Sequence, residues 1–226
     1  MAWERCLQAN ISAIGKNGQQ KLSSSTFAIA GLGGVGGTAF ELLVRAGARE
    51  IRIADGDFFE EQNANRQSMW SRKTEGRSKT QVAKMFAREV NPRCKIPVFS
   101  RITAENTLRF SKGCVATIDA TDTPHSRMCI WGGCRESRTP YIFASAKGAR
   151  GLLSVVPPGR SRLPCFFAKR PVAVSCDHAL GPVANAIGCL AAQQAINTAL
   201  GKPIVAYPGF FSLDAFSRKP AACAVF

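Results

Sequence analysis

Phe27-Ala28-Ile29-Ala30-Gly31-Leu32-Gly33-Gly34-Val35-Gly36-Gly37 joins an apolar run to a glycine-rich turn. Residues 26–30 have the length and composition of one buried strand, and residues 38–45 (TAFELLVR) have those of a helix. A strand, a glycine turn and a helix in this order leave backbone N–H groups free at the positive end of the helix dipole, which favours phosphate. The spacing fits the nucleotide-binding pattern G-x-G-x-x-G, and a glycine turn without a ligand is the alternative.

The rest of the chain alternates short apolar runs with helical patterns. We predict strands at 50–54, 96–99, 115–119, 140–144 and 152–156, and helices at 79–89, 104–110, 126–136 and 180–200. On the helix at 79–89 we expect Val82, Met85 and Phe86 to lie on one face, with Val90 after them. This alternation predicts an α/β fold with a doubly wound, mostly parallel Rossmann-like sheet and an antiparallel extension. We expect one domain over residues 1–226, with an N-terminal helical arm at 1–24 that is interrupted near Gly15 and Gly18, and a proline- and arginine-rich crossing loop at 157–178.

The composition is strongly basic. The 226 residues include 30 Lys and Arg against 15 Asp and Glu, a formal net charge of +15. This balance favours anionic partners such as nucleotides, acidic proteins or nucleic acid, and a solvated basic surface is the alternative. We find no apolar run of about 18 residues and no signal-peptide pattern, so we expect a cytoplasmic protein without a membrane span. The nine cysteines are scattered, and we expect most to be reduced.

Charged residues follow two of the predicted strands. Asp55 comes directly after the second strand, at the spacing from the first glycine where dinucleotide-binding folds hold ribose hydroxyls. Asp122 follows the fourth strand, and Arg66 and Lys79 lie between the two acids. Two cations and two acids around a phosphate-binding turn suit a nucleoside triphosphate with Mg²⁺. The alternative is that they are surface charges of a basic protein.

Several motifs, in order, resemble one family. They are Gly31-Leu-Gly-Gly-Val-Gly36, Asp55-Gly-Asp57, Asn63-Ala-Asn65-Arg66-Gln67, Lys79, Asn91-Pro92, Asp119-Ala-Thr-Asp122 with Arg127, and Leu180-Gly-Pro-Val183. This order resembles the ThiF/MoeB/HesA family, small relatives of ubiquitin-activating enzymes, from about residue 14 to the C-terminus.

The resemblance implies a homodimeric enzyme that uses ATP and Mg²⁺ to adenylate the C-terminal glycine carboxylate of a ubiquitin-like sulfur-carrier protein, releasing pyrophosphate. It implies that the glycine turn cradles phosphates, that Asp55 holds the ribose and that Asp122 binds Mg²⁺. The remaining phosphate contacts implied are Asn63, Arg66 and Lys79. The glycines concerned are Gly31, Gly33, Gly34 and Gly36.

Three further positions bear on the resemblance. Cys176 occupies a place where some family members form a covalent link with the carrier, so it is a candidate nucleophile. Arg5 is a candidate for the arginine that reaches into the partner subunit's ATP site, although its spacing does not match cleanly. The two Cys-x-x-Cys zinc pairs of the family keep only Cys165 and Cys223, and two thiolates do not complete a tetrahedral site, so we expect no zinc.

Other functions remain open. An ATP-dependent tRNA threonylcarbamoyl-adenosine dehydratase of the same family fits the basic charge and the missing zinc pairs, and makes tRNA an alternative partner. A non-catalytic nucleotide-binding scaffold fits the weak N-terminal arginine match. An NAD-dependent oxidoreductase needs only the glycine turn, and nothing after that turn supports it.

Overall fold

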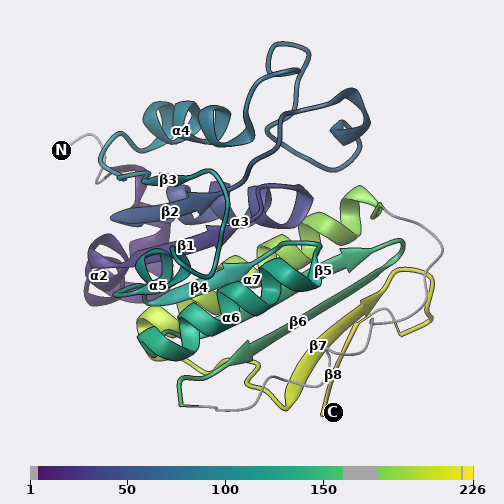
Figure 1. The fold of residues 1–226 in the computed structure, drawn as a ribbon. Helices are drawn as coiled ribbons and strands as arrows, with labels where there is room; N and C mark the ends of the chain where they lie inside the picture. The colour runs from purple at the N-terminus through teal and green to yellow at the C-terminus, as the bar shows by residue number, and fades with distance from the viewer. Residues whose placement is uncertain (1–4, 160–177, 220, 226) are drawn as a thin grey trace.

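The computed structural model describes residues 5–159, 178–219 and 221–225. Eight strands form one sheet in the order β3-β2-β1-β4-β5-β6-β7-β8 (Figure 1). The strands β1 to β5 run parallel, and β6, β7 and β8 extend the sheet with antiparallel pairing. The predicted doubly wound sheet with an antiparallel extension is confirmed. The strands span Thr26–Ala30, Glu50–Ala54, Val98–Phe99, Ala116–Asp119, Tyr141–Lys147, Arg150–Val156, Gly209–Asp214 and Ala221–Val225.

Helices cover both faces of the sheet, and the side chains of β1 point alternately toward the helices on one face and on the other. Phe27 and Ile29 point into a core shared with α3 and α7, whereas Ala28 and Ala30 point into a second core shared with α5 and α6. All five residues of β1 are buried, as expected for a central parallel strand. The helices are α2 (Gln8–Ser24), α3 (Gly34–Arg45), α4 (Lys79–Val90), α5 (Thr107–Ser111), α6 (Pro124–Ser137) and α7 (Gly181–Leu200).

The helices follow the prediction with some differences in bounds and in the buried face. α2 is kinked at Gly15, which has a φ of 75°, near the predicted interruption. α3 begins at Gly34, four residues before the predicted start, so the second half of the glycine stretch is already helical. On α4, Met85 was expected to face the core with Val82, but its side chain is 48% exposed, and Ala83 and Ala87 fill the buried face instead.

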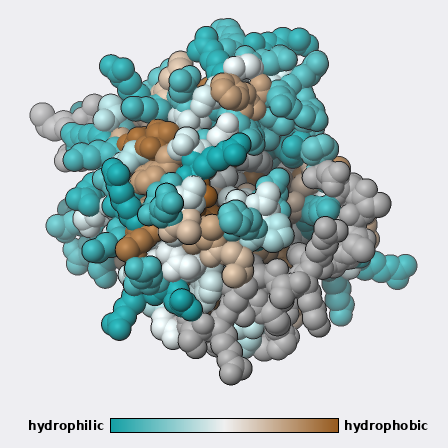
Figure 2. All heavy atoms as spheres, in the orientation of Figure 1, coloured by the Kyte–Doolittle hydropathy of each residue, from teal (hydrophilic) through white to brown (hydrophobic). Residues whose placement is uncertain are grey.

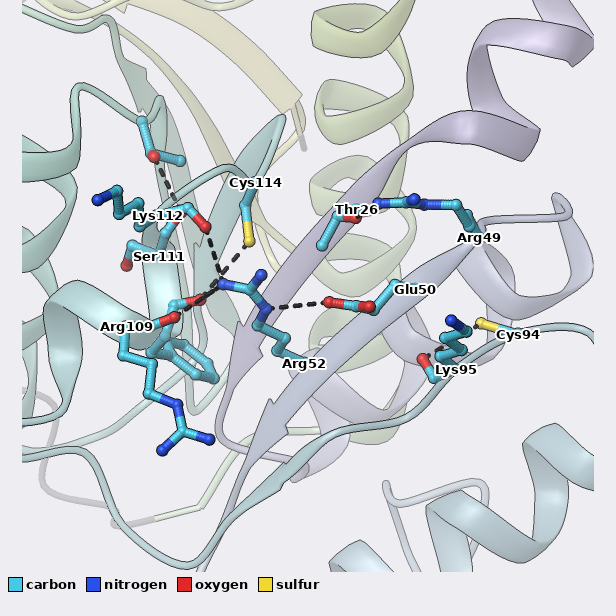
Figure 3. A network of polar contacts seen from close by, with 12 residues as sticks. Thr26, Arg49, Glu50, Arg52, Cys94, Lys95, Arg109, Ser111, Lys112 and Cys114 are labelled. Carbon is cyan, nitrogen blue, oxygen red and sulfur yellow. Dashed lines mark hydrogen bonds and ion pairs between the residues drawn. The ribbon is translucent and has the colours of Figure 1, made fainter.

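A partly buried cation joins β2 to α5. Arg52 on β2 donates from Nη1 to the carbonyl oxygens of Arg109, Phe110 and Lys112 at 2.8, 3.1 and 2.9 Å. Its Nε forms an ion pair with Glu50 at 3.1 Å (Figure 3). A guanidinium on the last carbonyls of a helix satisfies acceptors that have no partner inside the helix. Arg52 therefore anchors the short α5 against the sheet.

The surface is mostly polar. Hydrophilic side chains cover much of the face drawn in Figure 2, and the apolar areas on it are small and separate. Within the described residues, no helix is both long and apolar enough to cross a bilayer.

Candidate active site

The glycine turn lies at the carboxyl end of β1, where β2 and β4 also end. Gly31 has a φ of 85°, and its N–H donates to the Ala54 carbonyl at 2.8 Å. A Cβ at Gly31 would lie only 2.7 Å from the Ala120 carbonyl oxygen, so a side chain is excluded by contact as well as by backbone conformation. The turn is therefore held between the ends of two neighbouring strands.

The first turn of α3 presents free hydrogen-bond donors. Gly33 is the N-cap and supplies no side chain, and the first amide of the helix with an accepting carbonyl is that of Gly37, bonded to Gly33 at 2.8 Å. In the described part of the chain, no group accepts from the N–H groups of Gly34, Val35 or Gly36. Free N–H groups at the positive end of a helix bind anions.

Asp55 connects this turn to the end of β2. Its two carboxylate oxygens accept from the backbone N–H of Leu32 at 2.6 Å and of Asp57 at 2.7 Å. Burial raises the pKa of Asp55, while the nearby Lys79 ammonium and the two N–H donors lower it. The residue predicted to hold a ribose hydroxyl therefore also fixes the path of the glycine turn.

Lys79 is the first residue of α4 and is directed back toward the same strand end. Its Nζ lies 3.1 Å from Oδ2 of Asp57, and the exposed fractions of the two side chains are 7% and 72%. The backbone N–H of Lys79 also donates to the Asp57 carbonyl at 3.0 Å. Asp57 was not predicted to have a site role of its own. The signal was its position two residues after Asp55, at the same strand end.

Arg66 lies in the loop between β2 and α4. Its Nη1 donates to the Gln62 carbonyl at 2.9 Å and to Oδ1 of Asn65 at 2.8 Å, and its Nη2 is 3.4 Å from Nδ1 of His178. Burial lowers the pKa of Arg66. The Arg66 carbonyl accepts from Asn185 on α7 at 3.3 Å, which fastens the loop to that helix.

The side chains of two other predicted residues differ in exposure. Asn63 is buried, and its Oδ1 accepts from the Glu60 N–H at 3.1 Å, so its amide oxygen shapes the loop. Asp122 is exposed and follows β4. The N–H of Ala120 donates to the Ala30 carbonyl at 2.9 Å, which places this turn beside the glycine turn. The structure thus brings Gly31, Gly33, Gly34, Gly36, Asp55, Lys79 and the Asp122 turn to one edge of the sheet.

Arg5 and the cysteines stand apart. Arg5 is exposed at the opposite edge of the sheet, close in sequence to Leu7, whose side chain packs beside Gly47 beyond the end of α3. Cys176 and Cys165 lie outside the described residues, and Cys223 is exposed on β8. Among the described residues, no group of three or more His, Cys, Asp or Glu side chains is arranged to hold a metal ion.

A model of the "ThiF family" matches residues 6–224, nearly the whole chain. The chain belongs to the ThiF family. The adenylyltransferase and sulfurtransferase MOCS3 of Drosophila yakuba is 32% identical over 197 residues, which cover 83% of this chain and 43% of that protein. The adenylyltransferase and sulfurtransferase uba4 of Aspergillus clavatus is 31% identical over 232 residues, which cover 94% of this chain and 47% of that protein. The ThiF chain thus spans less than half the length of these relatives.

Solved structures match the fold of this ThiF-family chain. Escherichia coli MccB with ATP superposes with a TM-score of 0.79 at 19% identity, covering 96% of this chain and 69% of that one. The same protein with selenomethionine MccA gives a TM-score of 0.82 at 18% identity, and the match covers 98% of this chain and 71% of that one. At this identity the likeness concerns the fold alone, and it agrees with the sheet described above.

Proposed function

We propose that this ThiF-family chain is an adenylyltransferase that uses ATP to activate the C-terminal glycine carboxylate of a ubiquitin-like sulfur-carrier protein. The observation that carries the proposal is the free first turn of α3, flanked by the buried Lys79 ammonium and by the Asp122 turn. The names of the curated relatives, adenylyltransferase and sulfurtransferase, support it.

The residues present suit ATP. Gly33 leaves room at the turn: among the described residues, its two chain neighbours apart, only Nε2 of Gln67 comes within 4 Å of a Cβ placed there, at 3.8 Å. Oε1 of Gln67 is buried and has no hydrogen-bond partner among the described residues. A buried amide oxygen without a donor is costly unless a ligand or water supplies one. The free donors at α3 and the open space at Gly33 fit a ligand that carries phosphates.

Each side chain has a distinct role in this proposal. Asp55 accepts a hydrogen bond from a ribose hydroxyl, while Lys79 and Arg66 neutralise phosphate charge, with Asn63 beside them in the loop. The gain is mainly positioning and electrostatic stabilisation, since attack of a carboxylate oxygen on the α-phosphate concentrates negative charge at one place. Asp122 would hold Mg²⁺ together with phosphate oxygens, as is usual for this ion, and the metal would neutralise developing charge on the leaving pyrophosphate.

The partners follow from the family resemblance. We propose a homodimer in which Arg5 serves the partner subunit's ATP site, because Arg5 lies at the edge of the sheet away from the glycine turn of its own chain. Cys176 is the proposed site of a covalent link with the carrier. The product is an acyl-adenylate, whose mixed anhydride is then open to attack by a sulfur nucleophile.

The test is ATP–pyrophosphate exchange with labelled pyrophosphate and candidate carriers that end in glycine. We expect exchange that requires the carrier and is lost when its terminal carboxylate is amidated. Lys79→Met should reduce exchange by a factor of 100 or more, on the order expected for loss of one charge-stabilising group. Lys84→Met, which removes an exposed lysine from the same helix, is the matched control and should leave the exchange rate unchanged.

Other outcomes separate the alternatives. Absence of exchange with every carrier, together with ATP hydrolysis stimulated by tRNA, would replace this proposal by the dehydratase, which the net charge of +15 favours. Tight binding to tRNA should then weaken steeply with salt. Nucleotide binding without exchange or hydrolysis would instead favour a scaffold.

A further inference from the structure

The carboxylate of Asp119 is buried at the end of β4 and accepts three hydrogen bonds. The residue is 1% exposed. Its Oδ1 accepts from the backbone N–H and the hydroxyl of Thr121, at 2.9 and 2.6 Å. Its Oδ2 accepts from the Tyr141 hydroxyl on β5 at 2.5 Å. Burial raises the pKa of Asp119, and the three donors oppose that rise because they favour the ionised form. These contacts fold the chain back on itself directly after the strand.

A cation from α6 holds the same turn from the other side. Arg127 donates to the Thr121 carbonyl from Nε at 3.2 Å and from Nη2 at 2.8 Å. Its guanidinium also lies over the Phe143 ring, 5.0 Å from the ring centroid, so the side chain is fixed by stacking as well as by hydrogen bonds. Thr121 is therefore held at its N–H, its hydroxyl and its carbonyl by groups from β4 and α6.

This arrangement leaves little freedom for the residue that follows. Ala120 is bonded to Ala30 on β1, and its carbonyl oxygen is in close contact with Gly31, so the start of the turn is locked to the glycine turn. Asp122 comes next after Thr121 and is exposed. A carboxylate on an exposed turn would otherwise sample several positions, and holding it in one position lowers the entropy lost when a ligand binds.

We propose that Asp119, Tyr141 and Arg127 are positioning residues that clamp Thr121 and thereby fix the Asp122 carboxylate for a metal–nucleotide complex. None of the three touches the ligand in this proposal. The inference rests on the proposed function, in which Asp122 holds Mg²⁺ with ATP. It predicts that loosening the clamp affects binding of ATP with Mg²⁺ more than binding of ATP alone.

The Tyr141 hydroxyl is the sharpest place to test the clamp. Tyr141→Phe removes one donor to Asp119 and keeps the ring, which packs edge-on to Trp131 with centroids 5.7 Å apart. Ser154→Ala is the matched control. It removes another buried hydroxyl, bonded to the Gly209 carbonyl at 2.7 Å, on β6 of the antiparallel extension, and this hydroxyl has no hydrogen bond to Asp119 or Thr121. Each variant loses one buried hydrogen bond donated by a hydroxyl, so a general loss of stability should affect both.

The measurement is binding of a fluorescent ATP analogue with Mg²⁺ and, separately, with EDTA. We expect Tyr141→Phe to weaken binding with Mg²⁺ about tenfold, the factor that corresponds to one hydrogen bond to a charged group, and to leave binding in EDTA unchanged. Ser154→Ala should change neither, and Asp122→Ala should abolish the effect of Mg²⁺. Arg127→Met should repeat the result of Tyr141→Phe.

Several results would overturn the clamp. If Tyr141→Phe weakened nucleotide binding equally with Mg²⁺ and with EDTA, the Tyr141–Asp119 hydrogen bond would be an ordinary structural contact. The same conclusion would follow if Ser154→Ala gave the same response as Tyr141→Phe. Wild-type protein that binds no nucleotide would refute both the clamp and the proposed function. A clamp effect on nucleotide binding in a protein that shows no exchange with any carrier would refute only the proposed acyl transfer.

Discussion

Gly36→Ala places a methyl group where the structure has no room for one. Gly36 lies in the first turn of α3, and a Cβ there would be 1.8 Å from the Gly31 carbonyl oxygen, whereas ordinary contacts begin at 3.4 Å. The obstacle is backbone, so α3 and the glycine turn would have to separate. Overpacking of this kind costs about 3 kcal/mol, at the upper end of the usual range. The better helix propensity of alanine returns about 1 kcal/mol, which leaves a net loss of about 2 kcal/mol.

Gly132→Ala is the control variant, for which we expect a change in the free energy of unfolding of opposite sign. Gly132 is also helical, on α6, and a Cβ there would meet nothing within 4 Å. This variant should gain about 0.5–1 kcal/mol, so the two alanine variants should differ by about 3 kcal/mol. The assay is equilibrium urea unfolding followed by far-ultraviolet circular dichroism, with nucleotide affinity measured alongside. A Gly36→Ala protein as stable as Gly132→Ala, or one that binds nucleotide with unchanged affinity, would refute the close approach of α3 to the turn.

Three further changes test other contacts. Asp57→Asn leaves the buried Lys79 ammonium without its charged partner and should lower the free energy of unfolding by about 1 kcal/mol. If phosphate replaces the carboxylate beside Lys79, added ATP should reduce this difference between variant and wild type in thermal unfolding. Arg52→Met removes the bonds to three carbonyls at the end of α5 and should cost about 2–4 kcal/mol in urea unfolding. Burial raises the pKa of the Cys94 thiol to about 12, so alkylation near pH 8, followed by mass spectrometry, should label it far more slowly than the exposed Cys6, Cys189 and Cys223; equal rates would contradict this.

Two of the three strands that carry the site, β1 and β2, could be predicted to the residue, whereas β4 begins at Ala116, one residue after its predicted start. β1 is buried on both faces and ends at a glycine. β2 alternates buried with partly exposed residues and ends at Asp55, so the bounds of both strands are visible in the sequence. The start of α3 could not be predicted, because Gly34, Val35, Gly36 and Gly37 have poor helix propensity. Tertiary packing overrides that propensity, since Gly34 fits against Ala184 and the Arg66 carbonyl.

Contacts between distant segments were the hardest to predict. The order of motifs indicated that Asp55, Lys79 and Asp122 share one edge of the sheet. It did not indicate that the Tyr141 hydroxyl donates to Asp119 or that Arg52 donates to carbonyls at the end of α5. These contacts depend on how strands and helices pack in three dimensions. Met85 was misplaced because a hydrophobic stripe on a helix shows its periodicity but not how wide a face the sheet covers.

The position of β1 in the sheet has a consequence for how the chain is made. β1 pairs with β2, which follows it closely, and with β4, which is synthesised only after α4, β3 and α5. While a ribosome is producing that intervening segment, one side of β1, all of whose residues are buried in the finished protein, has no backbone partner. Unpaired strand edges in incomplete chains promote aggregation, and such distant pairings form slowly. Nascent chains that end before residue 116 should therefore depend on chaperones more than the finished protein does.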